Sequence, residues 1–162
     1  MPKKIKALFL AFLIASLTVT CLAQQVVDKV NLLKEQIENS KTTDSLSLHF
    51  DELIDIYSKD NKLDEFYIFL ETLNNKNKIF KDAPVIYYFK ALARFRQMQF
   101  LEENKMWQEL FDKKDSYIKD LSESLAKVKE FSKTASSWIL RSQLLEYKIK
   151  KDKEENAFDV LE

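Results

Sequence analysis

The stretch Asp-Ala-Pro-Val-Ile-Tyr-Tyr-Phe-Lys-Ala-Leu-Ala-Arg-Phe-Arg-Gln-Met-Gln at residues 82–99 decides the fold. Asp82 and Pro84 predict the start of a helix, because the N–H that proline lacks would be unpaired in a first turn anyway. An apolar stripe follows at helical spacing and has apolar residues on both flanks; the stripe is Val85, Tyr88, Leu92 and Phe95, and the flanks are Ile86, Tyr87, Phe89, Ala91 and Met98. A helix with two packing faces needs neighbours on two sides, so we expect this helix at the centre of the fold.

The composition favours helices throughout the chain. Glycine is absent from all 162 residues, and only two prolines occur. Glycine supplies the tight turns of many sheet proteins and the phosphate-binding loops of nucleotide-binding proteins. The sequence therefore contains no Walker loop and no dinucleotide-binding fingerprint. Few breakers and apolar residues at helical spacing predict an all-α protein.

Outward from residues 82–99, apolar periodicity predicts about eight helices. They cover residues 25–39, 44–59, 62–75, 84–99, 100–112, 115–132, 134–150 and 153–162. Asn74 and Asn75 are expected to end the third helix with a left-handed cap, because asparagine is the next-best residue after glycine there. The short connections make consecutive helices antiparallel neighbours. Two arrangements remain open, a short right-handed solenoid of helical hairpins and a compact helical bundle.

The N-terminus has the pattern of a secretion signal. Three lysines lie within residues 2–6, and the uncharged, largely apolar run 7–20 follows. Small residues stand three and one positions before Gln24, as an A-x-A-type cleavage site requires. We expect cleavage between Ala23 and Gln24, which leaves residues 24–162 as a single all-helical domain in the periplasm or outside the cell.

Two alternatives concern the same segment. It could remain as an uncleaved anchor helix, although its apolar run is shorter than the about 20 residues of a membrane span. Cys21 could instead carry a lipid and tether the protein to the membrane. Thr20 and Thr18 depart from the small residue and the leucine that a lipobox has at these positions.

The residue types in the sequence argue against a catalytic thiol, a metal site and a nucleic-acid-binding surface. Cys21 is the only cysteine and His49 the only histidine. Cleavage would remove the one thiol, and His49 cannot complete a two-histidine metal motif. The 26 basic and 26 acidic residues do not give the basic balance of a nucleic-acid-binding protein. We therefore expect that the protein is not an enzyme and that it binds no metal, no cofactor and no nucleic acid.

The spacing of several residues resembles the 34-residue tetratricopeptide repeat. Residues 134–162 carry Trp138, Ser142 and Leu145 at spacings of four and three, with Phe158 and Leu161 in a second predicted helix. Residues 84–112 are similar, with Tyr88, Ala91, Leu92 and Phe95 and then Trp107 and Leu110. The turn glycine of the family is missing, and the two copies are farther apart than one repeat.

This resemblance implies a scaffold that binds proteins or peptides, and exported members are similar to envelope-assembly components of bacteria. A tyrosine, two cations and an amide share one side of the central helix and form a candidate groove for acidic or C-terminal peptide groups; they are Tyr87, Lys90, Arg94 and Gln97. The alternative function is a small bundle that binds an apolar ligand or a membrane surface. The basic run 148–153 is expected to be a solvated helix end or, alternatively, an anionic-membrane contact. The last two helices are expected to mediate self-association or contact with a partner.

Overall fold

The computed structural model describes residues 23–41, 46–132 and 137–158, with side chains described as far as residue 151. The chain divides into two compact units, Met1–Asn39 and Ser40–Glu162. In the first unit, a helix covers residues 23–38 and so includes both residues of the predicted cleavage site. Cys21 and the rest of the predicted signal lie outside the described residues.

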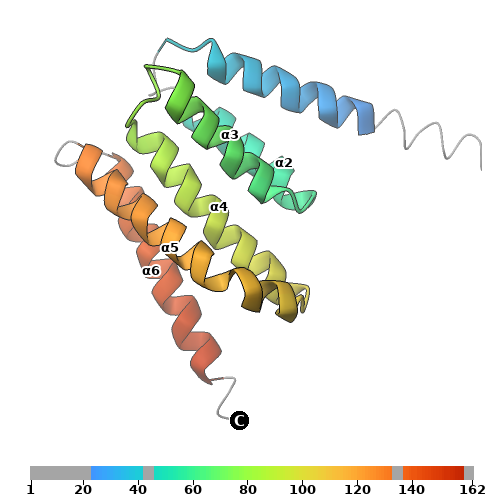
Figure 1. The fold of residues 1–162 in the computed structure, drawn as a ribbon, viewed down its shortest axis with the longest axis vertical. Helices are drawn as coiled ribbons and strands as arrows, with labels where there is room; N and C mark the ends of the chain where they lie inside the picture. The colour runs from blue at the N-terminus through green and yellow to red at the C-terminus, as the bar shows by residue number, and fades with distance from the viewer. Residues whose placement is uncertain (1–22, 42–45, 133–136, 159–162) are drawn as a thin grey trace, which may run out of the picture. The chain divides into compact units, whose positions relative to one another are not determined.

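The second unit contains five helices, which Figure 1 labels α2–α6: α2 Ser47–Lys59, α3 Leu63–Lys76, α4 Pro84–Glu103, α5 Trp107–Phe131 and α6 Ser137–Phe158. With the helix over residues 23–38, the described residues contain six helices and no strand. The prediction of an all-α protein is confirmed. The prediction of eight helices is not.

The predicted helix ends that the structure does not have lie in the C-terminal half of the chain. The predicted helices 100–112 and 115–132 are parts of the continuous helix α5 and of the end of α4. The predicted helices 134–150 and 153–162 are joined in the single helix α6 over residues 137–158, and the rest of both ranges lies outside the described residues. Neither Lys113-Lys114 nor Asp152 interrupts a helix, because lysine is a good helix former and one aspartate costs only a fraction of a kcal/mol.

Helix α4 lies at the centre of the second unit, as the sequence predicts. It contacts α2, α3, α5 and α6, and in Figure 1 it runs between α3 and α5. Its buried residues occur on nearly all of its faces, and they include Ile86, Phe89, Ala91, Ala93 and Leu101. This arrangement is compatible with the compact bundle, whereas the right-handed solenoid stays a prediction.

The largest aromatic cluster joins four helices through Phe89 of α4. Its ring centroid lies 5.1 Å from that of Phe50 in α2 and 6.5 Å from that of Phe66 in α3. The ring of Trp138 in α6 lies 6.4 Å away. Phe50, Phe66 and Phe89 are fully buried. Because the Phe89 side chain contacts α2, α3 and α6, its packing helps to fix the positions of these helices relative to α4.

A second apolar cluster lies between α4, α5 and α6. Its buried members are Ala91, Phe95, Leu121, Leu125 and Leu145. Leu121 and Leu125 belong to the repeating apolar face of α5, which the sequence indicates by its helical spacing. This cluster holds α6 against α4 and thereby determines where their exposed side chains meet.

In the turns, residues other than glycine adopt the left-handed backbone conformation. Asn61, Asp82 and Lys105 have φ angles of 54°, 58° and 57°. After α4, the amide of Met106 donates to the carbonyl of Leu101 at 2.8 Å, which closes the end of the helix around Lys105. The prediction that Asn74 and Asn75 end α3 is wrong, because α3 continues to Lys76.

None of the described helices is both long and apolar enough to span a membrane.

Candidate binding groove

The four residues of the sequence-predicted groove lie together where α4 faces α3 and α5. Tyr87 and Gln97 are buried, and the side chains of Lys90 and Arg94 are only 12% and 11% exposed. Each of the four side chains has an intramolecular partner, but the Oε1 of Gln97 is buried and accepts no hydrogen bond from a described residue. Tyr87 Oη donates to Asp82 Oδ1 at 3.1 Å, and Gln97 Nε2 donates to Asn61 Oδ1 at 3.2 Å. A peptide would have to compete with these contacts, so binding at this surface stays a prediction.

Arg94 forms the most extensive of these contacts. Its guanidinium bonds to Asp64 of α3, and its Nε donates to Asp120 Oδ2 of α5 at 2.9 Å. The guanidinium carbon also lies 3.7 Å from the ring centroid of Tyr67 and 4.7 Å from that of Tyr117. Arg94 therefore joins α3 and α5 across α4, and its planar guanidinium both pairs with carboxylates and stacks on the tyrosine rings.

The tyrosines around Arg94 are kept protonated. Burial and, to a lesser extent, the carboxylate of Asp120 raise the pKa of Tyr67 to about 12, with Arg94 partly opposing both. Burial likewise raises the pKa of Tyr117, with the carboxylate of Asp64 adding to the effect. These shifts arise from packing inside the helical unit and do not identify a reactive group.

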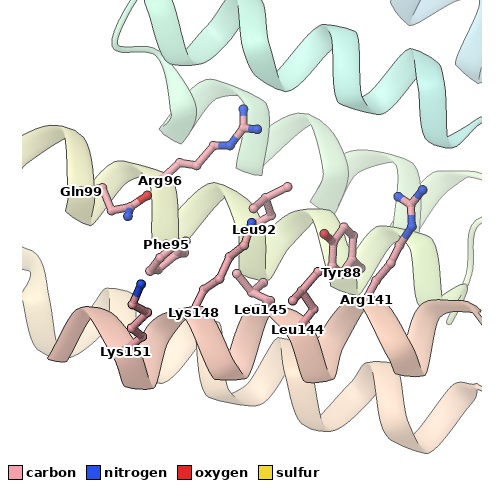
Figure 2. Close-up of a pocket in the computed structure, with 10 residues that line it drawn as sticks. All are labelled: Tyr88, Leu92, Phe95, Arg96, Gln99, Arg141, Leu144, Leu145, Lys148 and Lys151. Carbon is pink, nitrogen blue, oxygen red and sulfur yellow. The ribbon is translucent and has the colours of Figure 1, made fainter. Parts of the chain in front are cut away.

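An open groove lies elsewhere on α4, where it faces α6. Its volume is about 360 Å³, and Figure 2 shows its ten lining side chains. From α4 come Tyr88, Leu92, Phe95, Arg96 and Gln99, and from α6 come Arg141, Leu144, Leu145, Lys148 and Lys151. We call this site the α4–α6 groove. The volume is within the range of clefts that bind small molecules or single side chains.

The chemistry of the α4–α6 groove combines an apolar floor with a cationic rim. The floor consists of Leu92, Phe95, Leu144 and Leu145, and Leu144 is 56% exposed. Among the described lining residues, the rim carries four cations and no carboxylate. A site of this composition favours ligands that combine apolar groups with negative charge.

Two of the four cations are partly neutralised from α2. Arg96 bonds to Asp55, with a side-chain exposure of 59% for the aspartate, and Arg141 Nη1 lies 3.8 Å from Asp51 Oδ2. Burial raises the pKa of Asp51 above its ordinary value, against the lowering effect of Arg141. These ion pairs hold the arginines at the rim, but partly exposed pairs of this kind are weak and can be exchanged for pairs with a ligand.

Arg141 and Lys148 have different surroundings along α6. The guanidinium carbon of Arg141 lies 5.0 Å from the ring centroid of Trp138 and 5.8 Å from that of Tyr88, so aromatic rings orient it. Lys148 is exposed, and in Figure 2 its side chain extends from α6 toward Leu92 of α4. No ion pair joins Lys148 to another described residue. Lys148 is thus the rim cation most available to a ligand.

Metal chemistry finds no support in the described side chains. No group of three or more histidine, cysteine, aspartate or glutamate side chains among them could hold a metal ion. His49 is half-buried on α2, and its Nδ1 has no hydrogen-bond partner among these residues.

The sequence alone did not identify the α4–α6 groove. Tyr88, Leu92 and Phe95 appeared as a core stripe, and Lys148 as part of a solvated helix end. The spacing of Arg141, Leu144, Leu145 and Lys148 does place them on one side of a helix. That pattern becomes informative only once α6 is known to pack on α4, since the two halves of the site are about 50 residues apart and no local periodicity connects them.

No known protein family, characterised protein or solved structure shows a significant match to the chain.

Proposed function

We propose that the protein is an exported, non-catalytic helical scaffold whose α4–α6 groove binds an acidic, partly apolar segment of another protein in the bacterial cell envelope. The observation that carries the proposal is the composition of this groove. The described lining residues include four cations and no carboxylate at the rim, and the floor is apolar. A helical peptide with leucines on one face and glutamates beside them has the complementary pattern.

Both parts of the groove contribute to affinity in this proposal. Burial of apolar surface on the floor stabilises the complex by roughly 25 cal/mol per Å². The rim cations, above all Lys148, select against basic segments and raise the rate of encounter with acidic ones. Affinity should therefore fall as salt screens the rim, while the apolar contribution is retained.

The arrangement of α2 to α5 supports the resemblance to a helical-hairpin repeat, whereas the described part of residues 134–162 is the single helix α6 and not the expected pair. The pair α2 and α3 packs on α4, and the pair α4 and α5 packs on α6, so each hairpin contacts the next element in the chain. Ser142 and Leu145, which match the small and leucine positions of the repeat, are both buried. Successive hairpins of this kind form extended surfaces for other proteins.

Export and cleavage form the second part of the proposal. Intact-mass measurement of the protein after expression with its full N-terminus in a bacterial host tests it directly. We expect a mass that begins at Gln24. A mass that begins at Cys21 with added acyl chains would instead establish a lipid-anchored protein, and a mass that includes residues 1–23 would contradict cleavage.

Calorimetric titration of the protein tests the groove. The probe is a synthetic helical peptide of about 15 residues with leucine at helical spacing and glutamate on its polar face. Lys148→Glu is expected to weaken binding about tenfold or more, because it removes an attraction and adds a repulsion of together at least about 1.4 kcal/mol. The matched control is Lys150→Glu, which makes the same charge change at an exposed position of α6 outside the groove.

Three results would contradict this function. Equal losses in the Lys148 and Lys150 variants would show that only net charge matters. A peptide with lysine in place of glutamate that binds equally well would remove the role of the rim. Binding of anionic phospholipid vesicles, but not of the peptide, with the same dependence on Lys148 would favour the alternative of a membrane-surface protein.

A further inference from the structure

The first turns of α5 expose two large aromatic side chains. Trp107 is 56% exposed and Phe111 is 82% exposed. They are four residues apart on one helix, so their side chains lie on the same side of it. Single exposed apolar residues are ordinary, but a tryptophan and a phenylalanine that together form an exposed patch indicate an interaction surface.

Carboxylates lie beside this aromatic pair. Asp112 and Asp115 are both exposed, and Asp115 follows Phe111 by four residues on the same side of α5. The Oδ1 of Asp112 accepts a hydrogen bond from Gln108 Nε2 at 3.0 Å. We call Trp107, Phe111, Asp112 and Asp115 the α5 face. Exposed Lys114 lies at its opposite edge.

The α5 face has the composition that the α4–α6 groove requires of a ligand. It offers apolar side chains for the floor formed by Leu92 and Leu144, and two carboxylates for the rim. We infer that the α5 face of one molecule binds in the α4–α6 groove of a second copy of this chain. This inference rests on the proposed function, because it assigns an occupant to the same groove.

Charge distinguishes this contact from the other self-association that the groove allows. Two grooves placed against each other would bring the cationic rims of both copies together, which is repulsive. The contact between groove and α5 face instead pairs Lys148 and Arg141 with Asp112 and Asp115. It also brings the ring of Trp107 to a cationic rim, where a cation–π contact adds attraction.

The contact is heterologous, because the two partners use different surfaces. After one contact forms, one groove and one α5 face remain free at the two ends, so association continues into an open chain unless the rotation between copies closes it into a ring. The patch is small by the standards of stable interfaces, so we expect association at roughly micromolar concentration or above. An acidic segment of another protein would then compete with self-association for the groove.

Sedimentation equilibrium of the protein that begins at Gln24 tests the inference over a range of concentrations. We expect an average mass that rises above the monomer mass with concentration. Lys148→Glu and Asp112→Lys should each weaken association about tenfold or more. An equimolar mixture of the two variants should restore it, because the lysine introduced on the α5 face of one variant then meets the glutamate introduced in the groove of the other.

Matched controls separate this contact from general stickiness. Ile68→Ala removes an apolar side chain that is 60% exposed on α3, and it should leave association unchanged, whereas Trp107→Ala should weaken it. Circular dichroism verifies that each variant is folded. A strict monomer at every concentration, or a mixture that fails to restore association, would overturn the inference. If Lys148→Glu still weakens binding of the acidic peptide in that case, the proposed function stands; if it does not, both fail.

Discussion

Replacement of Phe89 by alanine is expected to lower the free energy of unfolding by about 3–5 kcal/mol. The ring is fully buried, and it packs against Phe50 of α2, Phe66 of α3 and Trp138 of α6. Its truncation removes these contacts at once and leaves a cavity that helices held by several other contacts can fill only in part. Urea denaturation followed by circular dichroism measures the change.

The control for this prediction is Phe111→Ala. The same substitution there removes a ring that is 82% exposed, so we expect a change within about 0.5 kcal/mol in dilute solution. Similar losses in the two variants would contradict the central position of Phe89. A loss confined to the slope of the denaturation curve would indicate a change in compactness rather than in stability.

Replacement of Arg94 by alanine is expected to cost about 2–3 kcal/mol of stability. The guanidinium is nearly buried and pairs with Asp64 and Asp120, so its loss leaves Asp120 without this cation and Asp64 paired with Lys113, whose Nζ lies 3.5 Å from Asp64 Oδ2. The expected cost is below that of a fully buried pair, because the Asp64 side chain is 45% exposed and water can partly replace the arginine. Loss of packing on the rings of Tyr67 and Tyr117 adds to the effect.

Two further variants sharpen this test. Arg96→Ala removes the neighbouring arginine, whose partner Asp55 is 59% exposed, and it should cost less than about 1 kcal/mol. Arg94→Lys keeps the charge but loses the planar fork, and it should lie between Arg94→Ala and the unchanged protein. Equal stability of the Arg94→Ala and Arg96→Ala variants would show that the contacts of Arg94 do not hold α3 and α5 together.

The central helix could be predicted from the sequence because the residues that indicate it lie within the helix itself. Pro84 begins α4, and apolar residues on all sides of it indicate a helix with neighbours all round. The end of α4 was harder to place. Lys105 adopts a left-handed conformation that lysine rarely takes, and a turn without glycine or proline gives no local pattern.

The number of helices was overestimated for a related reason. The predicted ranges leave out residues 113–114 and 151–152, but charged residues on a solvated side do not end a helix. Helices α5 and α6 therefore continue through these positions. Asp60-Asn61, by contrast, does end α2, because Asn61 adopts the left-handed conformation for which asparagine is suited.

The position of the groove could not be predicted, because it depends on which side of α4 each neighbour covers. The sequence offered polar residues on the side of Tyr87 and Arg94 and apolar residues on the side of Tyr88 and Leu92. The first set pairs with α3 and α5 inside the unit. The second lies beside α6 and remains partly open. The contacts of α4 with helices distant in sequence determine which of its sides stays open. The apolar periodicity within a single helix does not reveal these contacts.

The most direct test of the proposed function is a map of amide NMR shifts during titration of the protein with the acidic helical peptide. We predict changes concentrated in α6 from Arg141 to Lys151 and in the facing residues of α4. Changes concentrated in α3 and in the Asp120 region of α5, with α6 unaffected, would place binding at the side of Arg94 instead. That result, or the absence of any change at saturating peptide, would contradict the α4–α6 groove as the binding site.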